Sequence, residues 1–176
     1  MHLTYREIWT VLHGMGFGAI FLLAFAGGMA GLHSLRPELV TPAGVSERLR
    51  RMKAGLWVMA VVSWLTVISG TVVVYPWYRA PRVAGVELAH YPRLLLLSSP
   101  LTAGWHNFGM EWKEHIAWFV PILATAVAYL VQRYGRQLVH MPEVRRVTMA
   151  LLVLAFVTAG IAGALGAFIN KAATIR

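Results

Sequence analysis

The chain has 176 residues, of which 58% are hydrophobic and 13% charged, and its mean hydropathy is +0.61. These values lie outside the range of ordinary soluble domains and favour an integral membrane protein. Because there is no cysteine, disulfides, thiolate-held iron–sulfur clusters and covalently attached c-type haem are excluded. We assign the net charge of +9 to anionic lipid and membrane topology and not to nucleic acid, since a chain buried in lipid offers little surface to a polyanion.

Four apolar windows follow one another along the chain. A spanning helix needs about 20 residues, because it rises about 1.5 Å per residue through about 30 Å of hydrocarbon. Three windows are long enough by themselves, and the window that begins at Ile116 needs residues from its polar N-terminal flank. The sequence therefore predicts an all-α integral membrane protein, a four-transmembrane-helix bundle forming a single membrane domain. The predicted helices cover residues 8–32, 54–78, 109–133 and 147–170.

The first predicted helix carries His13 about five residues inside its window, beside Gly14, Gly16 and Gly18. Ionisable side chains inside a membrane are costly, so such a histidine is a candidate functional residue. Its structural alternative is a neutral histidine that hydrogen-bonds to a neighbouring helix. The glycines here, and those at 27–31, let helices approach closely in lipid. In the functional interpretation, Gly14 and Gly18 leave room for a flat macrocycle beside His13.

Similar basic segments, ERLRRMKA (47–54) and EVRRVTMA (143–150), suggest that the predicted helices form two tandem helical hairpins. About 30 residues join the hairpins, and a connection of that length usually carries structure of its own. Within it, residues 91–105 predict a short interfacial helix, apolar from Leu94 to Leu97. We expect this long loop to be structured, with these leucines largely buried, and to form a lid or a docking surface.

Basic residues indicate the orientation of the helices. With four spans, the compact loops near 33–53 and 133–146 share one side and carry more Lys and Arg than the other side, so we expect them to be cytoplasmic and both termini to lie outside. Arginine also outnumbers lysine among abundant Ala and Gly, which indicates a bacterial source and its cytoplasmic membrane. The cytoplasmic set is Arg36, Arg48, Arg50, Arg51, Lys53, Arg133, Arg136, Arg145 and Arg146, against Arg6, Arg79, Arg82, Arg93, Lys113, Lys171 and Arg176.

The entry to the third helix, WHNFGMEWKEHIAWFVP (105–121), concentrates titratable groups at the membrane edge. His115 lies about as deep as His13 if both helices enter from the same side. The pair would suit axial coordination of one b-type haem, because neutral imidazoles bind iron from both faces without adding charge. Glu111, one turn earlier, is the candidate to orient His115 through its other ring nitrogen. We interpret Lys113 and Glu114 as solvated residues of a helix end.

His106 is the rival to His115 as second ligand, if its segment folds back over the helices. A second haem would need His33 and His140. However, His13 and His33 are 20 residues apart, so they point to opposite faces at about 100° per residue. We therefore expect one haem.

These observations predict a membrane electron-transfer subunit: a b-type cytochrome with a bis-histidine haem near the outer face, working with quinol or a partner redox subunit. Two other classes stay open. One is a cofactor-free accessory subunit of a larger respiratory or photosynthetic complex. The other is a quinone- or copper-binding membrane protein that uses His and Met without haem. The expected partners are the lipid bilayer and other subunits of a membrane complex.

Overall fold

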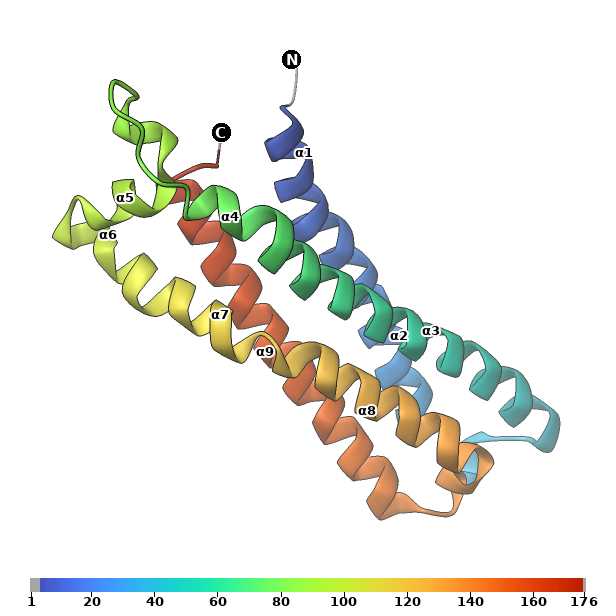
Figure 1. The fold of residues 1–176 in the computed structure, drawn as a ribbon. Helices are drawn as coiled ribbons and strands as arrows, with labels where there is room; N and C mark the ends of the chain where they lie inside the picture. Colours follow the sequence, from blue (N-terminus) through green and yellow to red (C-terminus); the bar gives the residue numbers. More distant parts are fainter. Residues whose placement is uncertain (1–3, 176) are drawn as a thin grey trace. The chain divides into compact units, whose positions relative to one another are not determined.

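The computed structural model describes residues 4–175, and most of this part of the chain is helical. Four of its helical runs are long and apolar enough to cross a membrane (Figure 1). Each run contains one of the segments predicted from the sequence, so the all-α fold with four helices of membrane-spanning length is confirmed. The runs are Tyr5–His33, Pro42–Tyr78, Pro100–Val139 and Pro142–Ala172.

The runs are built from shorter elements. The first joins α1 (Tyr5–Val11), the π-helical turn η1 (Leu12–Gly16) and α2 (Phe17–His33). The second joins α3 (Pro42–Ser69), the π-helical turn η3 (Gly70–Val74) and α4 (Tyr75–Tyr78). The third joins α6 (Pro100–Gly104), the π-helical turn η5 (Trp105–Met110), α7 (Glu111–Ile116), α8 (Phe119–Tyr134) and the 3₁₀ turn η6 (Gly135–Val139). The fourth is α9 (Pro142–Ala172), and the connections hold η2 (Pro37–Leu39), η4 (Leu88–His90) and α5 (Pro92–Leu97).

Two prolines account for irregular turns inside these runs. Pro121 has no N–H for the carbonyl of Ala117, and the helix opens into a turn there, between α7 and α8. Pro76 likewise leaves the carbonyl of Val72 without its usual partner, and the backbone takes the wider turn η3. The third run begins at Pro100, earlier than the predicted residue 109, so the titratable stretch lies within a helix.

The surfaces of the long helices are strongly apolar. In the most apolar window of each run, only 22–33% of the residues are buried. Leu23 is 76% exposed and Leu101 is 92% exposed. Apolar surface of this extent is unfavourable in water and is compatible with contact to a lipid bilayer.

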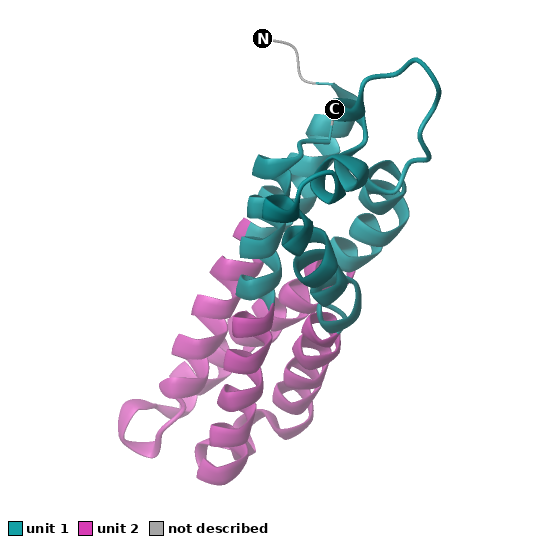
Figure 2. Cartoon of the chain, turned by 90° about the vertical axis from the view of Figure 1, so that its left-hand side faces the viewer, with its two compact units in different colours: residues 1–18, 65–118, 159–176 teal, residues 19–64, 119–158 magenta. Residues whose placement is uncertain are grey.

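Two compact units divide the described chain and are coloured separately in Figure 2. Unit 1 comprises residues 4–18, 65–118 and 159–175, and unit 2 comprises residues 19–64 and 119–158. Each unit takes segments from all four long runs, so the units do not coincide with the two hairpins suggested by the sequence.

Unit 2 packs through glycines of α2. A Cβ atom at Gly28 would lie 2.7 Å from Cδ2 of Leu56, and one at Gly31 would lie 2.7 Å from Sδ of Met52. Both partners belong to α3, so these glycines allow the close helix approach that the sequence predicts for 27–31. Gly27 differs, because a Cβ atom there would meet nothing within 4 Å.

Arginines hold the connections of unit 2. Arg48 donates from Nη1 to the carbonyl of Ser34 at 2.8 Å. Arg145 donates to the carbonyl of Leu35 and, at 3.2 Å, to the carbonyl of Leu138. These bonds supply side-chain donors to carbonyl groups at or beyond the ends of helices, where backbone donors run short.

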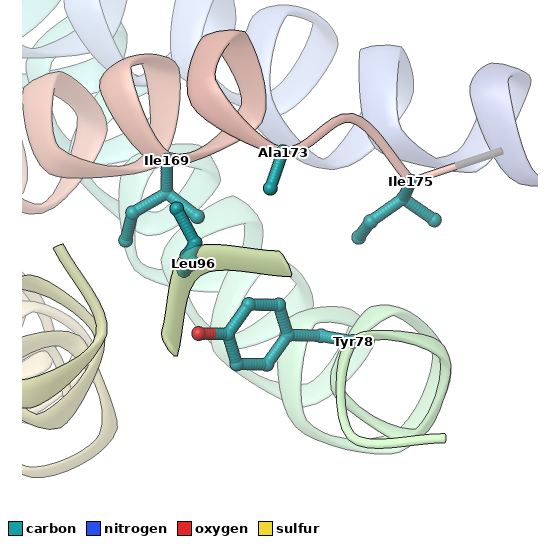
Figure 3. Packing of buried hydrophobic residues seen from close by; sticks show 5 residues of the cluster. All are labelled: Tyr78, Leu96, Ile169, Ala173 and Ile175. Atoms are coloured by element: carbon teal, nitrogen blue, oxygen red, sulfur yellow. The ribbon is translucent and has the colours of Figure 1, made fainter. Parts of the chain in front are cut away.

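Unit 1 has a core to which the long connection contributes. Leu96 of α5 is fully buried and packs with Tyr78 of α4 and Ile169 of α9 (Figure 3). The phenolic oxygen of Tyr91 accepts a hydrogen bond from the N–H of Val83 at 2.8 Å. Burial in this segment is uneven, since Leu97, in the stretch expected to be buried, is 38% exposed.

The two adjacent glycines of α2 allow a matched test of unit 2 packing. Gly28→Val should lower the unfolding free energy by about 1–3 kcal/mol, because the new side chain overlaps Leu56. Gly27→Val introduces the same residue one position earlier, where there is open space, and should cost less than about 1 kcal/mol. Thermal unfolding of the purified protein in detergent measures both. Equal losses for the two variants would contradict the packing.

Candidate functional site

The three π-helical turns of the described chain all belong to unit 1. His13 lies in η1, Gly70 opens η3, and His106 lies in η5. Turns of this kind are rare and often mark functional sites, because the extra residue redirects side chains. They were not predicted from the sequence.

His13 is held by the end of α3. Its Nδ1 lies 3.1 Å from Oγ of Ser69, and that hydroxyl in turn donates to the carbonyl of Thr66 at 3.1 Å. A serine hydroxyl has one hydrogen, so when it is used on Thr66, the bond to His13 requires a proton on Nδ1. In the neutral tautomer that carries this proton, Nε2 keeps a lone pair. The hydrogen bond to a neighbouring helix, which was the structural alternative for His13, is therefore present.

Gly70 makes room for the His13 ring. A Cβ atom at Gly70 would lie 2.7 Å from Cε1 of His13, and the next two atoms it would meet, Nε2 and Nδ1, belong to the same ring. A Cβ atom at Gly14 or Gly18 would meet nothing within 4 Å, so both positions face open space. The glycine that accommodates His13 is distant in sequence and lies on the partner helix.

Lys113 points toward α9 within unit 1 and is only partly exposed. Its Nζ would be 2.6 Å from a Cβ atom at Gly166 of α9, and the side chain lies close enough to His13 for electrostatic interaction. No hydrogen bond or ion pair joins Lys113 to another described residue. The expectation of a solvated lysine is therefore wrong, and the reason is the space that Gly166 leaves.

Glu114 is also held by protein groups instead of solvent. Nη2 of Arg79 lies 3.1 Å from each carboxylate oxygen of Glu114, and the hydroxyl of Tyr75 donates to Glu114 at 2.9 Å. The Arg79 guanidinium also lies over the Tyr75 ring, 5.0 Å from its centroid. The hydrogen bond that Arg79 donates to Glu114 raises the pKa of Arg79 above its already high ordinary value, so this cation stays charged.

Glu111 uses its side chain for Arg79, 3.3 Å away, and not for His115. Its backbone carbonyl accepts a hydrogen bond from Nδ1 of His115 at 2.8 Å, and the His115 ring is exposed. Lys113 and His115 are two residues apart on α7, so their side chains leave the helix about 200° apart. Because Lys113 points toward Gly166 of α9, the exposed His115 ring leaves α7 on another side, and no described contact joins His115 to His13.

His106 is buried in unit 1. Its Nδ1 forms a hydrogen bond of 2.9 Å with the hydroxyl of Tyr78, which is 2% exposed. The two rings lie 5.9 Å apart at an angle of 46°. His106 is therefore part of the core that α4 and α9 share, and it lies in a helix and not in a segment that folds back.

Within residues 4–175, no group of three or more His, Asp or Glu side chains is arranged to hold a metal ion. The site is instead a set of hydrogen-bonding and charged groups contributed by helices far apart in sequence. Five residues of this site were not predicted from the sequence, because no periodic pattern in a single chain marks them. They are Ser69, Gly70, Tyr75, Tyr78 and Arg79.

Comparison with known proteins returned no match to a family model, to a curated protein or to a solved structure.

Proposed function

We propose that this chain is a multi-pass membrane subunit of an electron-transfer complex, and that His13 and Lys113 bind the ring of a quinone or quinol. The observation that carries the proposal is a histidine held by Ser69 and, in the same unit, a lysine that reaches Gly166 and has no described acceptor. Polar groups in an apolar helical protein are costly and therefore usually functional.

The two side chains complement a quinone ring chemically. The free Nε2 lone pair of His13 accepts a hydrogen bond from a quinol hydroxyl, and the Lys113 ammonium donates to a quinone carbonyl. Both bonds are strengthened by the low dielectric around them. An apolar surface with a few oriented polar groups is the usual character of a small-molecule site.

Oxidation of a quinol releases two electrons and two protons. In this proposal, Nε2 of His13 takes one proton and the carboxylate of Glu114, which Tyr75 and Arg79 hold near the helix end, takes the other. The electrons pass to a redox group of a partner subunit. This proposal keeps the electron-transfer role predicted from the sequence, but it places a quinone and not a haem at His13.

A b-type haem is the second candidate, and a shared feature of two histidines supports it. His13 and His115 each use Nδ1 for a hydrogen bond to a protein oxygen, leaving Nε2 free. Metal-ligating histidines are typically oriented in this way. Since no described contact joins His115 to His13, one haem held by this pair within a single chain is disfavoured. The quinone proposal therefore takes precedence.

Replacement of His13 should separate the two candidates. In the quinone proposal, His13→Ala and Lys113→Met each lower the quinone that copurifies with the protein about tenfold, because each removes one strong hydrogen bond. His115→Ala is the matched control and should leave the quinone content unchanged. Extraction and chromatography of quinones from each purified variant give the measurement.

A pyridine haemochrome spectrum of the same samples completes the experiment. A haem signal lost in both His13→Ala and His115→Ala would replace the quinone proposal by the haem candidate. Neither quinone nor haem in the wild-type protein would contradict both and leave the cofactor-free accessory subunit.

We further propose that the helices lie in a bacterial cytoplasmic membrane with both termini outside. The support is the excess of basic residues in the two compact connections. Single cysteines can be placed freely in a cysteine-free chain. Cysteines at Thr4 and Pro42, both exposed positions, should react with a membrane-impermeant thiol reagent from opposite sides, with Pro42 cytoplasmic. Reaction of both from the same side would contradict the topology.

A further inference from the structure

A groove opens between α2 and α3 in unit 2, away from every residue of the proposed quinone site. Its volume is about 450 Å³. Apolar and glycine positions line one part of it, including Leu23, Gly27 and Gly55, and charged residues line another, including Glu47 and Arg48. We propose that this groove binds one anionic phospholipid, with an acyl chain along the glycines and the phosphate at Arg48.

The apolar part of the groove exists because two of its positions have no side chain. A Cβ atom at Gly27 or at Gly55 would meet nothing within 4 Å. The neighbouring Gly28 and Gly31 are already filled by Leu56 and Met52 of α3. Helix packing therefore accounts for one pair of glycines and leaves the other pair open to an occupant.

Arg48 supplies a charge without a described counterion. Its Nη1 donates to the neutral carbonyl of Ser34, at 2.8 Å, and no carboxylate within residues 4–175 pairs with it. The nearby acid, Glu47, is engaged by Arg50 at 2.8 Å and by Arg51 at 2.6 Å. A phosphate group is the complementary anion for the remaining guanidinium. A lipid with a cationic headgroup would bring a second positive charge toward Arg48, which favours an anionic headgroup.

The distance along α3 between Arg48 and the apolar part of the groove matches the distance between the phosphate and the acyl chain of a lipid. Gly55 follows Arg48 by seven residues on α3, which corresponds to about 10 Å along the helix. The basic end lies in the first turns of α3, at the side of the helices that we assign to the cytoplasm, where basic pockets between helices bind anionic headgroups. The inference rests on membrane insertion and is independent of the roles of His13 and Lys113.

Native mass spectrometry of the detergent-solubilised protein tests this site. The wild-type protein should bind one phosphatidylglycerol molecule about fivefold more tightly than phosphatidylcholine with the same acyl chains, the contribution of about one basic residue. Arg48→Gln should remove this preference. Gly27→Leu and Gly55→Leu should each weaken binding of both lipids, because the new side chain fills the groove.

Gly163→Leu is the matched control, since Gly163 is another open glycine and lies in α9, outside the groove. It should bind both lipids as the wild type does. An equal affinity for the two lipids in the wild type, or unchanged binding in both Gly27→Leu and Gly55→Leu, would overturn the proposal. A dimer that both variants dissociate, in place of a lipid adduct, would assign the groove to a second copy of the chain and overturn it too.

Discussion

Unit 1 depends on the close approach of the His13 ring to Gly70. A side chain at position 70 would occupy the space of the ring, and the ring would then lose its place beside Ser69. The hydrogen bond to Ser69 orients the ring, and when the Ser69 hydroxyl donates to Thr66 it is Nδ1 of His13 that carries the proton in this bond. The absence of a side chain at Gly70 thus determines how the His13 ring on another helix is oriented. The widened turns η1 and η3 occur at these two contact points.

The positions of the charged side chains of unit 1 also depend on space left by a glycine and on partners from other helices. Lys113 reaches inward because Gly166 leaves space for its ammonium group. Glu114, one residue later, turns to Arg79 and Tyr75, which neutralise its charge and satisfy its oxygens. A charged group inside an apolar protein needs either such partners or a ligand. Glu114 has partners, whereas Lys113 lacks them within the described chain, and this difference makes Lys113 the group available to a ligand.

The sequence predicts the helices well because uncharged length alone determines which segments can span a membrane. It also selects His13, since a histidine inside an apolar window is conspicuous. It does not predict the partners of His13, because Ser69 and Gly70 resemble any small residues of an apolar helix until the two helices are placed together. Lys113 and Glu114 were misinterpreted for the same reason: a charged helix end is usually solvated, and the glycine and arginine that hold these side chains are distant in sequence.

A double-mutant cycle between Gly70 and His13 tests the central contact most directly. Gly70→Ala should lower the unfolding free energy by about 1–3 kcal/mol in the wild-type background, because the methyl group displaces the His13 ring. In the His13→Ala background the ring is gone, and the same change should be neutral or stabilising, since alanine favours helix over glycine by about 1 kcal/mol. Thermal unfolding in detergent gives the coupling between the two positions. An equal loss of stability in both backgrounds would contradict the account.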